Sequence, residues 1–277
     1  MKIINNIKGF SQWRSNVNDD VGFIPTMGAL HKGHLSLIQL SVENNEFTVV
    51  SIFVNTLQFA PNEDFNTYPR TLENDLKLLD SLKVDVVFIP NEKEIYPKDF
   101  SFEISENLIS KKLEGVYRPN FFPGVLTIVN KLFNIVKPKD SFFGQKDFQQ
   151  LAVIKKMVRD LSMPVTIHSC KTIRDKNGLA LSSRNSYLNS DEKVNASIIY
   201  KSLLEAKELI IQDKNIEPVK KMLENSLNNF GMKIDYISFA SLNNLEEMSE
   251  LCVCPLIISV AVWFKKVRLI DNIIVDN

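Results

Sequence analysis

Two histidines, His31 and His34, stand where an apolar strand-like segment passes through a glycine-bearing turn into a helix-like one. At positions i and i+3 they would share one face of the first helical turn. Unpaired backbone N–H groups at a helix start suit a phosphate. The run therefore predicts a phosphate-binding corner, although two incidental histidines in a turn would give the same spacing. Zinc is disfavoured because no third ligand is evident. The third histidine, His168, lies in a strand-like run and is expected to be structural.

Two further segments follow predicted strands. After residues 47–54, Gln58 offers an amide that can both donate and accept, which suits a small hydroxy acid. After residues 141–143, Lys146 supplies a point charge beside a glycine, and Gln150 lies one helical turn further on. The alternatives are a solvated loop for the first segment and a capped helix start, with Asp147 as the N-cap, for the second.

A fourth segment, residues 178–185, is polar and turn-like and lies between two predicted domains. Ser182, Ser183 and Arg184 combine two hydroxyls with a guanidinium, a combination that can hold a phosphate. At a domain boundary such a loop could act as a movable lid. The whole set lacks a Ser-His-Asp arrangement, a nucleophile and a P-loop, so it favours electrostatic catalysis at a nucleotide phosphate.

Composition narrows the class of protein. The chain has 277 residues, and its 33 basic and 33 acidic side chains leave no net charge, which argues against a nucleic-acid surface. No apolar stretch is long enough to span a bilayer, and the first residues lack the apolar core of a signal peptide. Cys170, Cys252 and Cys254 are interpreted as reduced thiols because their spacing suggests neither a disulfide framework nor a complete metal site. We therefore expect a cytoplasmic protein without a membrane partner.

The first 173 residues alternate strand-like and helix-like patterns, which predicts a parallel sheet with helices on both faces. Such sheets bind ligands at the carboxyl ends of their strands. The predicted strands are 21–24, 47–54, 84–89, 141–143 and 165–169, and the predicted helices are 35–43, 71–82, 125–136 and 148–161.

The pattern changes near residue 174. Two amphipathic helices, 191–212 and 217–230, precede strands at 234–240, 256–264 and 267–275. The fold class expected is therefore α/β, with a Rossmann-like parallel sheet in an N-terminal domain (1–173) and a smaller α+β C-terminal domain (174–277) that acts as a lid. Ser190 is the N-cap candidate for the first of these helices.

With these motifs in hand, the chain resembles the pantothenate synthetase (pantoate–β-alanine ligase) family of HIGH-type nucleotidyltransferases. The resemblance covers nearly the whole chain in order, from Pro25–His31 through Phe53–Asn55, Gln58-Phe59, Tyr68–Arg70, Gly144–Gln150 and Gly178–Asn185 to Arg268–Asn272. It implies that the carboxylate of (R)-pantoate attacks the α-phosphorus of ATP, and that the amine of β-alanine then attacks the pantoyl adenylate to give pantothenate and AMP. It also implies Mg²⁺ at the phosphates and a homodimer.

The resemblance also assigns roles to residues of this chain. His34 matches the family's proton donor, and His31, Lys146 and Arg184 would assist at the phosphates. Gln58 and Gln150 match the amides that hold pantoate, and Asp75 matches a position associated with the metal. The ATP-binding positions are Met27, Gly28, Ala29, Leu30, His31, Lys32, Gly33, His34, Gly144, Gln145, Lys146, Asp147, Ile173, Leu181, Ser182, Ser183 and Arg184.

The chain departs from the family pattern at several positions but loses none of the residues that the chemistry needs. Thr56 replaces a proline, Gln145 a glutamate and Phe121 a histidine, and Asn74 stands at a usually acidic position. Near the C-terminus, Trp263 and Phe264 replace a usual arginine and a small residue. Two other hypotheses remain: a nucleotide-binding module that has lost catalysis, and a nucleotidyltransferase that stops at an adenylylated product.

Overall fold

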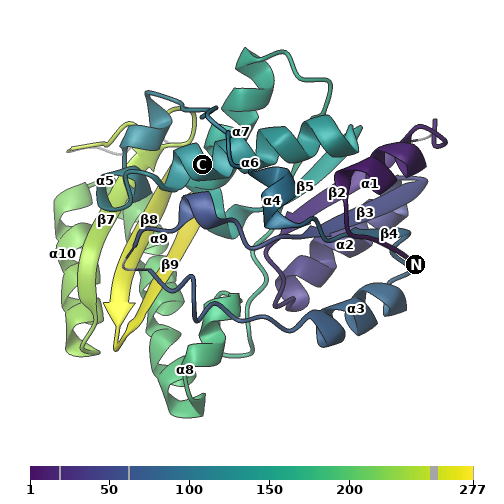
Figure 1. Ribbon diagram of the computed structural model, residues 1–277. Helices are drawn as coiled ribbons and strands as arrows, with labels where there is room; N and C mark the ends of the chain where they lie inside the picture. The colour runs from purple at the N-terminus through teal and green to yellow at the C-terminus, as the bar shows by residue number, and fades with distance from the viewer. Residues whose placement is uncertain (19, 62, 250–254, 277) are drawn as a thin grey trace.

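The computed structural model describes residues 1–18, 20–61, 63–249 and 255–276. A parallel sheet of six strands forms the first half of the molecule and confirms the predicted α/β fold. Figure 1 shows helices packed on this sheet. Its strands, in the spatial order β1-β4-β3-β2-β5-β6, are β1 (Lys2–Ile4), β4 (Val86–Phe88), β3 (Phe47–Ile52), β2 (Val21–Thr26), β5 (Asp140–Gly144) and β6 (Thr166–Cys170).

Consecutive strand residues point to opposite faces, so each of these strands feeds two apolar clusters. Phe23 and Val49 join the cluster that α1 (Ile7–Arg14), α6 (Phe121–Val136) and α7 (Phe148–Asp160) cover. Their neighbours on the same strands, Ile24 and Val50, face the other way. They pack under α2 (Lys32–Asn44) and α3 (Leu72–Ser81). The near-continuous apolar runs of the strands therefore follow from burial on both faces.

The order of the strands creates a switch point between β2 and β5. From β2 the chain continues to β3 on one side, whereas β5 pairs on the other side of β2 and leads to β6. Ligands of open parallel sheets bind outside the carboxyl ends of strands at such a point. Two segments follow these strands there. We call residues 27–34, after β2, the histidine turn, and residues 145–147, after β5, the lysine turn.

The C-terminal part has its own antiparallel sheet and its own apolar cluster. The sheet consists of β7 (Lys233–Ser241), β8 (Leu256–Phe264) and β9 (Val267–Val275), and the helices against it are α8 (Ser190–Ala196), α9 (Ile198–Asp213) and α10 (Ile216–Asn229). In Figure 1 this green and yellow half stands beside the strands of the parallel sheet. Ala240, Leu245 and Ile257 also pack into the N-terminal core, so the two parts share an apolar contact.

Several local predictions were wrong. The helix expected over 191–212 is two helices, because at Ser197 the hydroxyl donates to the Val194 carbonyl and the turn tightens. The N-cap is Asn189 rather than Ser190, and it forms a capping box with Glu192. The sequence interpretation also missed β1 and α1, together with the short helices α4 (Glu92–Ile95), α5 (Glu114–Tyr117), η1 (Thr56–Gln58), η2 (Ile109–Lys111), η3 (Gln145–Asp147) and η4 (Ser183–Tyr187).

The cysteine and membrane predictions are tested only in part. Cys170 is a free, buried thiol, while Cys252 and Cys254 lie outside the described residues. In the parts of the chain that the structure describes, none of the helices has the length and apolar character needed to cross a bilayer.

Candidate functional site

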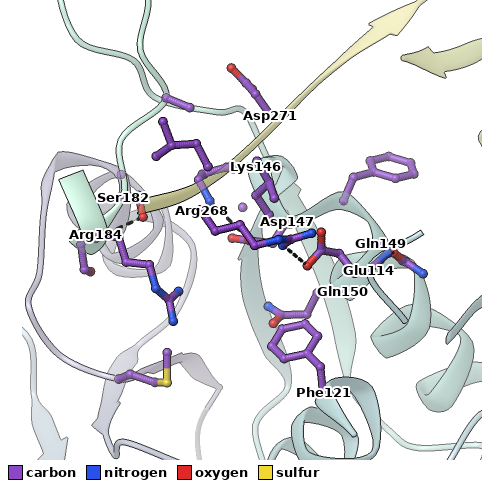
Figure 2. Close-up of a pocket in the computed structure, with 18 of the residues that line it drawn as sticks. Glu114, Phe121, Lys146, Asp147, Gln149, Gln150, Ser182, Arg184, Arg268 and Asp271 are labelled. Atoms are coloured by element: carbon purple, nitrogen blue, oxygen red, sulfur yellow. Dashed lines mark hydrogen bonds and ion pairs between the residues drawn. The ribbon is translucent and has the colours of Figure 1, made fainter. Parts of the chain in front are cut away.

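A cleft of about 780 Å³ lies at the switch point, between the parallel sheet and the C-terminal sheet. This volume falls within the range of small-molecule sites. Figure 2 shows that Lys146 and Gln150, from the N-terminal part, face Arg268 from β9, with Ser182 and Arg184 entering from a separate loop. The four segments singled out in the sequence therefore meet in one cleft.

The turn after β2 is held from behind by a buried carboxylate. Gly28 and Ala29 both have positive φ, at 80° and 51°, so the chain reverses sharply before α2. The two oxygens of Asp75 accept hydrogen bonds from the backbone N–H groups of Ala29 and Leu30, each at 2.9 Å. The Thr71 hydroxyl also donates to this carboxylate at 3.0 Å. Asp75 thus fixes a turn whose conformation L-residues rarely adopt.

The two histidines cap the helix that follows this turn. The Gly33 N–H donates to Nδ1 of His31 at 3.1 Å, and the His31 N–H donates to Nδ1 of His34 at 3.4 Å, a reciprocal capping box. A nitrogen that accepts a hydrogen bond carries no proton, so we assign both rings as neutral Nε2–H tautomers. A side chain at Gly33 would press against the His31 ring, within 2.8 Å of Cε1.

Burial agrees with neutral rings. Burial, then the charge of Lys146, lowers the pKa of His31 to about 4, with Asp147 opposing. Burial, then His31 and Lys146, lowers the pKa of His34 to about 3. The ring centres lie 4.1 Å apart, so a second positive charge in this pair would be repelled. At neutral pH the pair can therefore donate hydrogen bonds but does not add charge.

Lys146 stands on the short helix η3 that joins β5 to α7. Its ammonium lies 3.3 Å from the Asp147 carboxylate, and Asp147 is the N-cap position of α7, although its side chain makes no capping hydrogen bond. The adjacent glutamines Gln149 and Gln150 both line the cleft, but the Gln149 amide nitrogen is committed to the carbonyls of Ile109 and Lys112. Figure 2 shows Gln150 below the Arg268 side chain.

The loop of residues 178–185, which we call the serine loop, lines another side of the cleft. Ser182 caps η4, and the Ser183 hydroxyl donates to the Ala29 carbonyl at 3.0 Å, which ties this loop to the histidine turn. Arg184 makes a bidentate pair with Asp64, with N–O distances of 2.8 and 2.7 Å. Burial alone would lower the pKa of Arg184, but Asp64 raises it, so the guanidinium stays charged.

Gln58 is oriented by an asparagine that sequence reasoning had left without a role. Asn55 is 1% exposed; its amide donates to Gln58 Oε1 at 2.9 Å and to the Gly124 carbonyl at 3.1 Å. The Tyr96 hydroxyl donates to the Asn55 oxygen at 2.6 Å. The Gln58 amide nitrogen donates to the Met27 sulfur at 3.3 Å, so its second N–H remains available to a ligand.

The cleft also contains an ion-pair network that the sequence interpretation missed. Arg268 bonds Glu114 and Asp235, each at 2.7 Å, and Arg118 makes a bidentate pair with Glu63 at 2.6 Å. Arg118 also lies 3.8 Å from Glu114, an i,i+4 pair that spacing could have suggested. The pairs Arg118–Glu63, Arg268–Glu114 and Arg268–Asp235 join distant parts of the chain, and the only other signal was that Arg268 belongs to the run that resembles the family.

Most predicted site residues line the cleft, and a few support it from behind. Those in the lining are Met27, His31, Gly33, His34, Gln58, Gly144, Lys146, Asp147, Gln150, Ile173, Leu181, Ser182, Ser183 and Arg184. Those outside the lining are Gly28, Ala29, Leu30, Lys32, Asp75 and Gln145. Asp75, which the resemblance associates with the metal, is 1% exposed, and its carboxylate already accepts three hydrogen bonds.

Comparison with known proteins gives one consistent result. A family model described as pantoate-beta-alanine ligase matches residues 2–274. The pantothenate synthetase of Fervidobacterium nodosum is 46% identical over 277 residues, which is 100% of this chain and 99% of that protein. That of Thermosipho africanus is 47% identical over 279 residues and covers 99% and 100%.

Solved structures agree with the sequence relatives. The crystal structure of pantothenate synthetase from Thermus thermophilus has a TM-score of 0.95 and 38% identity, with 100% of both chains covered. The pantoate-beta-alanine ligase from Francisella tularensis, solved as a complex with beta-gamma ATP and β-alanine, has a TM-score of 0.82 and 41% identity. That match covers 99% of this chain and 97% of the other.

Proposed function

The chain belongs to the pantoate–β-alanine ligase family, and from that premise we propose that its cleft carries out ATP-dependent ligation of pantoate to β-alanine through a pantoyl adenylate. The observation that carries this proposal is the convergence of the histidine turn, the lysine turn and the serine loop on one cleft at the switch point. These donors suit a triphosphate, and the two glutamine amides suit a small hydroxy acid.

The triphosphate is held by cations and neutral donors that approach from different sides. Lys146 supplies a point charge from one side, and Ser182, Ser183 and Arg184 approach from another. Asp64 occupies the Nε and Nη2 edge of Arg184, which leaves Nη1 to meet a phosphate oxygen. Ile173 is assigned to the adenine end of the nucleotide, and Leu181 belongs with Ser182, Ser183 and Arg184 to the phosphate loop.

The imidazoles act as hydrogen-bond donors in this proposal rather than as acids. Their Nδ1 atoms accept backbone hydrogen bonds, so Nε2–H is the group left to meet oxygens of the α-phosphate as charge builds up there. The resemblance described above implies that His34 is a proton donor; its pKa of about 3 favours donation of a hydrogen bond over release of a proton. The pantoate carboxylate is the nucleophile, and Gln58 and Gln150 orient it.

Magnesium fits this cleft as an ion carried by the nucleotide. In the described parts of the chain no cluster of three potential ligands is present, and the carboxylates of Asp64, Glu114 and Asp271 are held by arginines. Asp147, with its side chain 46% exposed beside Lys146, is the carboxylate most open to the ion. Bound Mg²⁺ supplies neutralisation of the β- and γ-phosphates.

The C-terminal residues 174–277 are proposed to act as a lid domain on a nucleotide- and pantoate-binding domain formed by residues 1–173. Support comes from their separate apolar cluster and from the contribution of β9 to the cleft wall. A lid that excludes water would protect the adenylate until the β-alanine amine attacks it. A homodimer, which the family resemblance implies, and a cytoplasmic location belong to the same proposal.

Purified protein tests the function directly. AMP formation should require ATP, pantoate and β-alanine together, and the mass of the product should be that of pantothenate. The His34→Ala variant should keep the fold, by circular dichroism, and lose the reaction by about 100-fold or more, as for removal of a preorganised transition-state donor. Release of an adenylylated product in the absence of β-alanine would favour an adenylyltransferase. Binding of ATP without turnover would favour a non-catalytic module. A His34→Ala variant of normal rate would refute the role of His34.

A further inference from the structure

Asn272 on β9 connects the C-terminal sheet to the lysine turn. Its side-chain amide donates to the carbonyl of Gln145 at 3.0 Å and to that of Lys146 at 2.8 Å. Asn272 is 8% exposed, so these two hydrogen bonds are shielded from solvent. One buried amide therefore holds two consecutive carbonyls of η3, the element from which the Lys146 side chain projects.

The preceding residue, Asp271, holds the base of the serine loop. Its carboxylate makes a bidentate pair with Arg174, at 2.5 and 2.9 Å, and is 4% exposed. Arg174 also donates to the Gly178 carbonyl at 3.1 Å, and its guanidinium lies 3.5 Å from the centre of the Tyr200 ring. The Asp271 carboxylate also accepts from the Asn272 N–H at 2.8 Å, so the two contacts are joined.

We propose that Asp271 and Asn272 are positioning residues, which fix the spacing between Lys146 and the serine loop across the triphosphate. This inference rests on the proposed function. These two neighbouring residues of β9 hold the two segments of the proposed phosphate site through separate partners. Asn272 bonds the carbonyls of η3, and Asp271 pairs with Arg174 at the base of the serine loop. Figure 2 shows Asp271 above Lys146, with Ser182 and Arg184 to the left of both. Neither residue needs to touch the nucleotide for this role, since each acts through its partner.

A double-mutant cycle between Asn272 and Lys146 tests the proposal, with pantoate-dependent ATP–pyrophosphate exchange as the readout. Asn272→Leu keeps the volume and removes the two donors, and it should lower kcat/KM for ATP by about 30- to 100-fold through misplacement of the turn. Lys146→Met should lower it by about 10- to 150-fold. If Asn272 acts through Lys146, the double variant should lie within about twofold of the lower single variant. Losses that multiply would overturn the proposal.

A second cycle keeps the test valid if Asn272→Leu does not fold. Arg174→Lys keeps the charge and loses the bidentate pair with Asp271, and its effect on kcat/KM for ATP should disappear in an Arg184→Gln background. An effect of equal size in both backgrounds would contradict the proposal. The matched control is Lys207→Met, which removes a 2.9 Å bond to the Ile274 carbonyl of the same strand but lies outside the cleft lining. It should leave kcat/KM unchanged within about twofold.

Wild-type protein separates this inference from the function on which it rests. If the wild type catalyses no pantoate-dependent exchange, the proposed function fails. If it does, and the losses in both cycles multiply, only the positioning role fails.

Discussion

Two neutral imidazoles at the proposed phosphate site are the central feature at the scale of single residues. An isolated histidine would be partly charged near neutral pH, but these two share one turn, lie among buried groups and face Lys146. Their Nδ1 atoms are committed to backbone N–H groups, which fixes where the remaining ring proton points. In the proposed site, Lys146 and Arg184 would supply the positive charge that the phosphates need. The histidines would supply hydrogen-bond donors of fixed direction.

The lowered pKa values predict acid sensitivity of the fold. The folded pKa values of about 4 for His31 and about 3 for His34 lie below the unfolded value of 6.5, so below pH 6.5 the unfolded chain binds more protons. The stability due to neutral rings is complete above pH 6.5 and falls as the pH drops from 6.5 towards those values. His31→Asn keeps an N-cap acceptor and removes one titration, so its loss between pH 7 and pH 5 should be smaller by about 1–2 kcal/mol.

Urea unfolding at the two pH values measures this difference. Equal losses of unfolding free energy in the wild type and His31→Asn would show that the His31 ring is already able to charge in the folded protein.

Among the elements, connecting turns rather than helices or strands do most of the positioning. The histidine turn, η3 and the serine loop each contribute residues to the cleft lining, and each is held by buried polar side chains from other elements. For the first of these turns that side chain is Asp75 on α3, distant in sequence from the turn that it holds. Phe121, where the family pattern has histidine, packs 3.9 Å from the Arg118 guanidinium at the start of α6.

Asp75→Asn distinguishes two roles of Asp75: holding the Gly28-Ala29 turn by hydrogen bonds and binding a metal ion. The substitution replaces a charged acceptor of two backbone N–H groups with a single carbonyl oxygen, so the free energy of unfolding should fall by about 2–4 kcal/mol. Because Asp75 lies outside the cleft lining, the Mg²⁺ concentration for half-maximal AMP release should stay within about twofold of the wild type.

Asp80→Asn is the matched control on the same helix, since the Asp80 side chain is 70% exposed and should change neither quantity. A large rise in the Mg²⁺ requirement of Asp75→Asn, without loss of stability, would restore the metal role.

At the scale of the whole molecule, the cleft exists because two sheets with separate cores stand side by side. The parallel sheet supplies the histidine and lysine turns, while β9 supplies Arg268, Asp271 and Asn272. Polar contacts such as Arg268 with Glu114 at 2.7 Å cross between the two parts. Motion of the C-terminal part against the sheet would therefore change the wall that faces the substrates.

Trp263 gives a signal for such closure. It lines the cleft from β8 and is 39% exposed, whereas Trp13 packs against Phe10 and Phe47 in the N-terminal part. Saturating ATP and pantoate should move the tryptophan emission to shorter wavelength, because closure would remove Trp263 from water. The change should be absent in Trp263→Phe, which keeps Trp13. Unchanged emission of the wild type at saturation would argue against closure.

The sequence alone determined the class of fold and the list of reactive groups. Strand-like segments that alternate with helix-like ones predict a parallel sheet buried on both faces. A segment that follows the carboxyl end of such a strand therefore lies at the edge of the sheet where ligands bind. That is why His31, His34, Lys146 and Gln150 could be predicted from local pattern. The boundaries that failed, at Ser190 and Ser197, depended on single side-chain hydrogen bonds that periodicity does not reveal.

Only the tertiary structure decided which charges are free and which are already paired. The sequence could not show that the oxygens of Asp75 accept hydrogen bonds from the N–H groups of Ala29 and Leu30. Nor could it show that Asn272 of β9 lies against η3. Pairings of this kind join residues about 45 to 127 positions apart. They arise from packing of whole elements, because a buried polar group must find its partner wherever the fold brings one.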